Sequence, residues 1–170
     1  MTGYSLRDAT PDDASAIAAI YAPFVTDTAI SFEETPPTAA DIAARIAQTQ
    51  KGYPYLVAES DGRVVAYAYA GAYRTRHAYR FTAEVTAYAH EAGRGHGIGA
   101  ALYDEVLARL TGAGFHTAVA IITLPNEASV RFHERMGFRH VGTIAEVGHK
   151  FDQWHDTGIW QRDLGRGTLG

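Results

Sequence analysis

Residues 80–102, RFTAEVTAYAHEAGRGHGIGAAL, form the stretch whose residue types and spacing point most clearly to chemistry. Its first half alternates, so Glu84, Thr86 and Tyr88 would share the polar face of a strand, with the carboxylate among aromatic side chains. Its second half is rich in glycine, and residues without side chains let backbone N–H groups and a helix N-terminus surround a phosphate. The stretch therefore predicts a proton-transfer group beside an anion-binding loop.

The letters GHGIGA at 95–100 satisfy the dinucleotide-binding pattern G-x-G-x-x-G/A as a string, but their context differs from that of a nucleotide fold. The dinucleotide fingerprint follows a fully buried parallel strand and precedes an acidic residue by about 20 positions. Here the preceding strand alternates, and the stretch 117–123 contains no carboxylate. A Walker A site would need Gly-Lys-Ser/Thr, which the sequence lacks. Neither nucleotide fold is predicted.

When it is taken as Arg94-x-x-Gly97-x-Gly99 between a strand and a helix, the segment resembles the pyrophosphate loop of the GNAT superfamily of N-acetyltransferases. The resemblance implies that the bound diphosphate belongs to acetyl-CoA, the acetyl donor. The residues to which it assigns donor binding are Tyr88, Ala89, His90, Arg94, Gly95, His96, Gly97, Ile98, Gly99, Ala100, Asn126 and Ser129. A glycine-rich turn without a ligand is the alternative that the loop alone leaves open.

A second segment matches the superfamily's later helix, N-x-x-A/S-x-x-x-[Y/H]-x-x-x-G-F. Asn126, Ser129 and His133 fall at this spacing, before Gly137 and Phe138. Most superfamily members carry tyrosine where this chain has His133. The histidine, together with RTRHAYRFTAEVTAY and the ending GHKFDQWHDTGIWQRDL, resembles the phosphinothricin N-acetyltransferases and their relatives that acetylate methionine sulfone or methionine sulfoximine.

Acetyl transfer to an amine needs one group that accepts a proton and another that supports the leaving thiolate. Glu84 is the candidate general base, directly or through water, because partial burial among aromatic residues would raise its pKa. The resemblance adds His133 as a second acid-base group, since imidazole titrates near neutrality. The alternatives are an ion pair of Glu84 with Arg76 or Arg80, and a purely structural His133.

Arg74, Arg76 and Arg80 form a basic cluster that is interleaved with Tyr73 and Tyr79. Guanidinium groups can bind a carboxylate and a phosphinate or sulfone oxygen bidentately, which would suit an anionic acceptor. The residues to which the resemblance assigns acceptor binding are Phe32, Arg74, Arg76, Tyr79 and Tyr88. A solvated loop is the alternative for the arginines.

Glu33 and Glu34 depart from the family, in which arginine often follows the equivalent of Phe32. Two carboxylates there would repel an anionic acceptor unless they point outward or pair with the arginines. The departure bears on phosphinothricin as the acceptor and leaves acetyl transfer itself unaffected.

The residues around these motifs predict the elements that must position them. Strands are expected at 4–8, at 55–60 and 63–71 around an Asp61-Gly62 turn, at 81–90, at 116–124, and near 139–144 and 158–162. Helices are expected after Thr10-Pro11, after Thr38, from the glycines to Gly112, and after Asn126. Pro23 should disturb the last turn of the first helix.

The resemblance implies the GNAT fold, an α/β (α+β) arrangement. In this fold a central mixed, mostly antiparallel twisted sheet of about six to seven strands is flanked by about four helices. One domain is expected over 1–165, with a flexible tail at 166–170. The resemblance also implies a homodimer, for which Phe151, Trp154 and Trp160 are candidate contacts, with core packing as the alternative.

Composition and net charge limit the classes of partner and cofactor that are expected. A chain of 170 residues with a net charge of −4 and a pI of about 6.0 is not expected to bind nucleic acid or membrane as its main partner. The sequence has no cysteine and no H-E-x-x-H motif, so no metal is expected, and the absence of cysteine suits the cytoplasm.

The favoured function is direct transfer of acetyl from acetyl-CoA to the α-amine of a small amino acid in a ternary complex, of the kind that gives herbicide or antibiotic resistance. Acetylation of a polyamine, which Glu33 and Glu34 would suit, or of a protein N-terminus is an alternative. A non-catalytic sensor of acyl-CoA is another.

Overall fold

The computed structural model describes residues 3–93 and 97–165, and in this part of the chain a single seven-stranded sheet forms the centre of the fold. In space the strands follow the order β1-β2-β3-β4-β5-β7-β6. The strands are β1 (Tyr4–Asp8), β2 (Tyr55–Ser60), β3 (Arg63–Ala72), β4 (Thr82–Ala89), β5 (Thr117–Leu124), β6 (Arg139–Lys150) and β7 (Gln153–Asp163). The helices are α1 (Ala14–Thr26), α2 (Ala39–Thr49), α3 (Ile98–Gly112) and α4 (Glu127–Arg135), with short 3-10 turns η1 (Pro11–Asp13), η2 (His77–Tyr79) and η3 (Glu91–Gly93).

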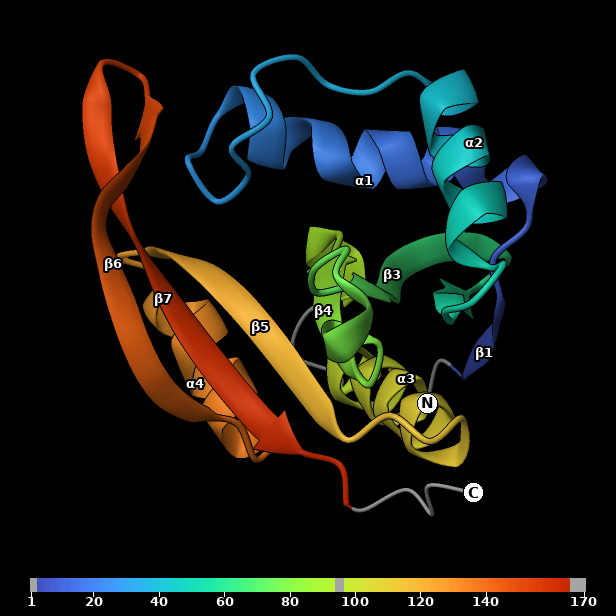
Figure 1. Cartoon of the computed structure of the whole chain (residues 1–170). Helices are drawn as coiled ribbons and strands as arrows, with labels where there is room; N and C mark the ends of the chain where they lie inside the picture. Colours follow the sequence, from blue (N-terminus) through green and yellow to red (C-terminus); the bar gives the residue numbers. More distant parts are fainter. Residues whose placement is uncertain (1–2, 94–96, 166–170) are drawn as a thin grey trace.

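The α-helices form two layers, one on each face of the sheet (Figure 1). α1 and α2 cover one face, where Ile17 and Ile46 belong to the same buried cluster as Tyr67. α3 and α4 cover the other face, where Leu102 and Val106 lie in a second cluster. Five pairings in the sheet are antiparallel, and β4 with β5 is parallel. The predicted mixed, mostly antiparallel sheet flanked by helices is confirmed. The expected tail at 166–170 lies outside the described residues.

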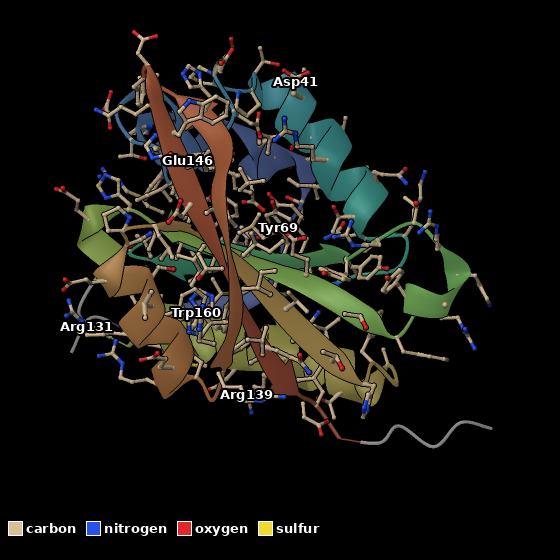
Figure 2. All side chains as sticks on the ribbon, turned by 60° about the vertical axis from the view of Figure 1, so that its left-hand side comes forward. Asp41, Tyr69, Arg131, Arg139, Glu146 and Trp160 are labelled. Carbon is tan, nitrogen blue, oxygen red and sulfur yellow. The ribbon has the colours of Figure 1, made fainter. Side chains whose placement is uncertain are left out.

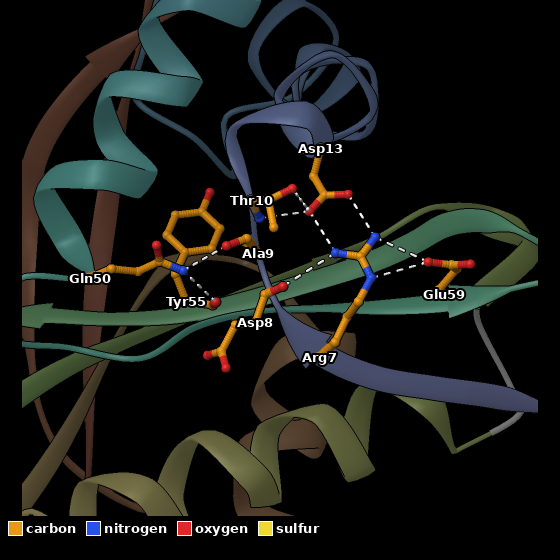
Figure 3. Close-up of polar contacts among 8 residues, drawn as sticks. All are labelled: Arg7, Asp8, Ala9, Thr10, Asp13, Gln50, Tyr55 and Glu59. Atoms are coloured by element: carbon orange, nitrogen blue, oxygen red, sulfur yellow. Dashed lines mark hydrogen bonds and ion pairs between the residues drawn. The ribbon is translucent and has the colours of Figure 1, made fainter.

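A charged network fastens β1 to the start of the first helical layer (Figure 3). Arg7 donates two hydrogen bonds of 2.8 Å to Asp13 and bonds of 3.0 and 3.2 Å to Glu59 of β2. Asp13 also accepts from the backbone N–H and the hydroxyl of Thr10. Because the Asp13 carboxylate is buried, this set of donors is what keeps it stable as an anion.

Pro23 lies in the last turn of α1, and the helix continues past it to Thr26. Proline removes one N–H from the helix, but the N–H of Asp27 still donates to the carbonyl of Pro23, so helical bonding resumes after it. α2 begins as predicted, because the Thr38 hydroxyl accepts from the N–H of Asp41 at 3.1 Å.

The parallel strands at the centre of the sheet separate soon after they begin. β4 and β5 pair at three positions, from Thr82 with Thr117 to Glu84 with Val119. The rest of β4 pairs with β3 alone, up to Ala89. The side of β4 beyond Glu84 is therefore free of a neighbouring strand, which leaves room for the cleft described below.

β6 and β7 are much longer than predicted and form a twisted hairpin at the edge of the sheet (Figure 1). The sequence predicted strands near 139–144 and 158–162, whereas the hairpin continues to a turn at Phe151 and Asp152, both with positive φ. Figure 2 shows Arg139 and Glu146 far apart along β6. Residues 145–157 are mostly polar and exposed, so this segment is held mainly by pairing between its two strands. It has no alternating burial pattern from which the sequence could have predicted it.

Candidate active site

A cleft of about 440 Å³ opens beside the free side of β4. α1, the loop between α1 and α2, β3, β4, β5, α4 and β7 all contribute to it. Its lining residues are Tyr21, Ile30, Ser31, Phe32, Glu33, Tyr69, Glu84, Val85, Thr86, Ala87, Tyr88, Ile121, Ile122, Thr123, Asn126, Ser129, His133 and Thr157. Among the sequence-predicted site residues, the structure thus brings together Phe32, Glu84, Tyr88, Asn126, Ser129 and His133.

Glu84 is a half-buried carboxylate at the point where β4 and β5 part. Burial raises its pKa, and the positive charge of Arg74 opposes that rise. Within the described residues Glu84 has no ion-pair partner, so the alternative of a pair with Arg76 or Arg80 is not seen. The Arg80 guanidinium instead lies 4.3 Å from the ring centroid of Phe81. The carboxylate is therefore available to a ligand in the cleft.

Aromatic rings form one wall of the cleft beside this carboxylate. The ring of Tyr88 lies 4.9 Å from that of Tyr21 and 4.9 Å from that of Phe24, measured between centroids. Tyr69, which Figure 2 shows between the sheet and the helices, completes the wall. Burial raises the pKa of Tyr21 to about 12. These tyrosines are therefore neutral near pH 7 and offer hydroxyl groups and ring faces, without charge.

Glu33 is neutralised by a residue that the sequence did not single out. Arg45 of α2 donates hydrogen bonds of 2.7 and 3.0 Å to the two carboxylate oxygens of Glu33, and this contact holds the pKa of Glu33 below its ordinary value. The Tyr21 hydroxyl donates to the same carboxylate at 3.0 Å. Glu34 is exposed. The repulsion that these carboxylates would exert on an anionic acceptor is therefore weakened by Arg45, and not by the arginines at 74–80.

His133 lies at the inner end of the cleft with both ring nitrogens in hydrogen bonds. Nδ1 lies 2.8 Å from the carbonyl oxygen of Ser129 and 3.3 Å from its hydroxyl, and Nε2 lies 2.9 Å from the hydroxyl of Tyr103. A carbonyl only accepts, so Nδ1 carries the proton and Nε2 accepts from Tyr103. Burial lowers the pKa of His133, whose exposed fraction is 8%. The ring is therefore neutral near pH 7.

The start of α4 lines the cleft with Asn126 and Ser129, and the start of α3 approaches α4 at Phe132. Gly97 begins α3 with φ of 75°, and a Cβ there would meet no atom within 4 Å. A Cβ on Gly99 would meet only the Phe132 ring at 4.0 Å. The side chain of Asn126 accepts from the N–H of Ser129 at 3.2 Å and caps α4 as predicted. Within the described residues the space beside these two glycines is therefore open, as an anion-binding helix N-terminus requires.

The other predicted donor contacts belong to the end of β4 and to the first turn of α3. Ala89 ends β4, His90 follows it and donates its backbone N–H to Val65, and Ile98 and Ala100 belong to the first turn of α3. The predicted residues Arg94, Gly95 and His96 lie outside the described residues.

The predicted acceptor-binding residues Arg74, Arg76 and Tyr79 do not line the cleft. They lie exposed on the loop between β3 and β4, where Tyr73 and Tyr79 pack edge to face at 5.7 Å. Arg74 approaches the Tyr73 ring at 5.1 Å, and its charge is felt by Glu84. The structure therefore places these arginines near the cleft's edge and not in its wall.

Several residues of the site carry no sequence signal. Ser31 and Thr157 are small polar residues in segments without periodicity, and Tyr69 reads as an ordinary strand residue. Tyr103 was expected only as part of an amphipathic helix, yet it holds His133. Contacts between segments far apart in the chain create these functions, and spacing along the sequence does not encode such contacts.

Two classes of feature are not found in the described ranges 3–93 and 97–165. They contain no group of three or more His, Cys, Asp or Glu side chains that could hold a metal ion. No helix in these ranges has the length and apolar character to span a bilayer.

Comparison with known proteins agrees with the fold. A family model described as an acetyltransferase (GNAT) domain matches residues 6–159. A phosphinothricin N-acetyltransferase of Streptomyces viridochromogenes is 38% identical over 94% of this chain and 87% of its own length. An L-methionine sulfoximine/L-methionine sulfone acetyltransferase of Pseudomonas aeruginosa is 37% identical over 94% of each chain.

A solved structure extends the agreement to three dimensions. The GNAT phosphinothricin acetyltransferase of Sinorhizobium meliloti, in complex with acetyl-CoA, superposes with a TM-score of 0.92 at 41% identity, covering 100% of this chain and 92% of that one. With a matching sheet, a family model over most of the sequence and relatives of more than a third identity, the chain belongs to the GNAT acetyltransferases.

Proposed function

We propose that this enzyme transfers the acetyl group of acetyl-CoA to the α-amine of a small amino acid or analogue, of the type of phosphinothricin, methionine sulfone and methionine sulfoximine. The observation that carries the proposal is the unpaired Glu84 carboxylate, which lines the cleft with a pKa raised by burial. The names of the relatives support the class of acceptor, and the acetyl-CoA complex of the Sinorhizobium meliloti protein supports the donor.

The N-terminal turn of α3 fits the diphosphate of the donor. The space beside Gly97 and Gly99 allows the backbone to approach phosphate oxygens closely, and the positive end of the helix favours an anion. Arg94, Gly95 and His96 would complete this loop, and Tyr88, Ala89 and His90 would border the adjoining chain of the donor. Asn126 and Ser129, which line the cleft from α4, would also contact the donor. When bound, acetyl-CoA supplies the thioester carbonyl that the amine attacks.

Glu84 serves as the general base. An α-amine is largely protonated near pH 7, and only the neutral amine has the lone pair that forms the new C–N bond. The Glu84 carboxylate accepts the proton, directly or through a water molecule. Burial keeps its pKa above that of an ordinary glutamate and so brings its affinity for a proton closer to that of the amine.

His133 serves as the second proton-transfer group. As the C–S bond breaks, the leaving thiolate takes up the proton that the amine has lost, and His133 supports this transfer by hydrogen bonding through its Nδ1–H, which the neutral ring keeps. The hydroxyl of Ser129, which lines the cleft 3.3 Å from Nδ1, connects the ring to the thiolate. The Ser129 carbonyl fixes the tautomer with the proton on Nδ1, and the hydrogen bond from Tyr103 to Nε2 holds the ring in place.

The acceptor occupies the part of the cleft between Glu84 and the α1–α2 loop. Phe32 and Tyr88 offer apolar walls for a short side chain. Arg74, Arg76 and Tyr79 bind its anionic groups from the loop beside the cleft, as the family resemblance implies. The positive charge of Arg74 acts at Glu84, which supports the placement of an anionic acceptor between the two regions.

The polyamine alternative loses its main support. It rested on Glu33 and Glu34 as partners for an acceptor's positive charges, but Arg45 already occupies both oxygens of Glu33. No contact in the described residues favours a peptide substrate or a non-catalytic sensor over acetyl transfer to a small amino acid.

We further propose that the enzyme acts as a homodimer in the cytoplasm. β6 is an edge strand that pairs with β7, and it exposes Val141, Ile144 and Val147, while Trp154 is 62% exposed. An apolar edge strand is a ready site for association with a second copy. Trp160 does not contribute, since it lies in the core. Sedimentation of Val147→Glu against the natural chain tests the dimer, because a buried carboxylate at the interface should yield a monomer.

A thiol-release assay with two variants tests the assignment of the site. Glu84→Gln and His133→Ala should each lower turnover by at least about tenfold, because each removes one proton-transfer group. Titration calorimetry should show that both bind acetyl-CoA as the natural chain does, because neither contacts the α3 turn. Full turnover in Glu84→Gln would remove it as the base.

A further inference from the structure

A buried lysine joins the far hairpin to the loop that borders the acceptor side of the cleft. Lys150, at the end of β6, is 4% exposed, and its ammonium donates to the carbonyl oxygens of Val25, Ser31 and Glu33 at 2.7, 2.7 and 2.8 Å. Among the described residues it has no carboxylate within ion-pair distance. A buried charge without a counter-ion is unusual, since desolvating it is costly.

The three carbonyls satisfy this ammonium completely. Lysine has three N–H donors in a tetrahedral arrangement, and here each meets one acceptor. The carbonyl of Val25 belongs to the last turn of α1, where it has no helical partner and where a positive charge is favoured. Arginine, with its planar fork, suits carboxylates better than three separate carbonyls. The chain has only two lysines, Lys51 and Lys150, among its 15 basic residues. A lysine at position 150 therefore does not reflect a general preference for lysine over arginine in this chain.

The segment that Lys150 holds forms part of the cleft. Four consecutive residues, from Ile30 to Glu33, line the cleft, and they lie in a loop without regular structure between α1 and α2. The same hairpin holds this loop at a second point, because a Cβ on Gly148 would overlap the ring of Phe32. Backbone without helix or strand bonds depends on such contacts for its shape.

We propose that Lys150 is a positioning residue for the acceptor: its ammonium fastens the α1–α2 loop to the β6–β7 hairpin and so presets the wall that Phe32 and Glu33 give to the cleft. The inference rests on the proposed function for the identity of the acceptor. Because this wall is already ordered, acceptor binding costs less conformational entropy. The donor site on α3 is unaffected.

The test compares Lys150→Met with Lys51→Met, which removes the exposed lysine and serves as the matched control. Steady-state thiol release should show that Lys150→Met raises the KM for the acceptor about tenfold or more, with the KM for acetyl-CoA changed less than about twofold. Hydrogen exchange measured by mass spectrometry should show faster exchange in the peptide covering 25–34. A merely stabilising lysine would lower Tm and leave both KM values unchanged, which would overturn the proposal.

Two further variants keep the comparison decisive. Lys150→Arg retains the charge but not the geometry, so its KM for the acceptor should rise as in Lys150→Met. A KM for the acceptor equal to that of the natural chain in Lys150→Arg would contradict the proposal. Because the chain has no cysteine, Lys150→Cys can be alkylated with bromoethylamine at that site alone, which restores an ammonium and should restore the natural KM. If none of the variants folds, Lys150 is a folding residue and the proposal fails. If the natural chain acetylates no amino acid, the proposed function fails, and the exchange of 25–34 still decides whether Lys150 holds the loop.

Discussion

The hydrogen bond between Tyr103 and His133 gives a prediction whose size follows from burial. Tyr103 is fully buried and His133 is 8% exposed, and the bond between them is 2.9 Å long. Tyr103→Phe removes the donor and leaves Nε2 without a partner, and an unsatisfied buried acceptor costs about 1–3 kcal/mol. For a domain of this length each kcal/mol lowers Tm by about 2–4 °C, so Tm should fall by about 2–12 °C.

A double-mutant cycle separates this bond from the loss of packing. His133→Phe strands the Tyr103 hydroxyl in the same way, whereas the double variant removes both partners and leaves neither group unsatisfied. The two substitutions should therefore couple by about 1–2 kcal/mol. Urea denaturation of the four proteins measures the coupling, with Tyr4→Phe as the control because Tyr4 is exposed.

The same variants test whether Tyr103 orients His133. Thiol release by Tyr103→Phe should be slower, because the ring loses its hydrogen bond at Nε2 and with it the orientation that keeps Nδ1–H on Ser129. Stability equal to that of Tyr4→Phe, together with no coupling in the cycle, would refute the view that Tyr103 positions His133.

Two further predictions concern charge. Arg74→Met should move the acid limb of the pH profile of kcat/KM to higher pH. Arg74 lowers the pKa of Glu84, so its removal raises that pKa, and the base then loses its charge at a higher pH. The control Arg63→Met, at the far end of β3, should leave the acid limb in place. Arg7→Met should lower the free energy of unfolding by about 1.5–3 kcal/mol, because Asp13 loses two charge-assisted hydrogen bonds, whereas the exposed Arg131→Met should change little. The pKa of Asp13 in the folded state is depressed, so its contribution to the free energy of unfolding is present above its ordinary pKa and is lost as pH falls through the depressed value. Arg7→Met should therefore lose less stability in acid than the natural chain. Thermal melts across pH measure this difference. An unchanged limb in Arg74→Met, or equal acid sensitivity in Arg7→Met, would contradict these electrostatic assignments.

Local chemistry explains what the sequence could predict of the fold. The Asp61-Gly62 turn and the Thr38 cap each depend on a few neighbouring residues, and each lies where the sequence predicted it. The alternation around Glu84 likewise gave its strand and its polar face. Such signals are short-range, so they survive in a single sequence.

The features that were missed depend on distant contacts. The outer half of the β6–β7 hairpin has no burial pattern, because its two strands mainly support each other. Arg45 forms its ion pair with Glu33, 12 positions away in the sequence, and Lys150 donates a hydrogen bond to Val25, 125 positions away. The alternating strand predicted Glu84 and the family resemblance added Phe32, Tyr88 and His133, but neither could show that the arginines at 74 and 76 would lie outside the cleft.

Acceptor specificity is the most direct test of the central claim. Thiol release from acetyl-CoA would be measured for the purified protein with phosphinothricin, methionine sulfone, methionine sulfoximine, glutamate, neutral amino acids and spermidine, each over a range that defines kcat/KM. Saturable turnover with at least one of the first three, and higher kcat/KM for it than for spermidine, is the predicted result. Turnover with spermidine alone, or none with any amino acid while acetyl-CoA still binds, would contradict the assignment of the acceptor site.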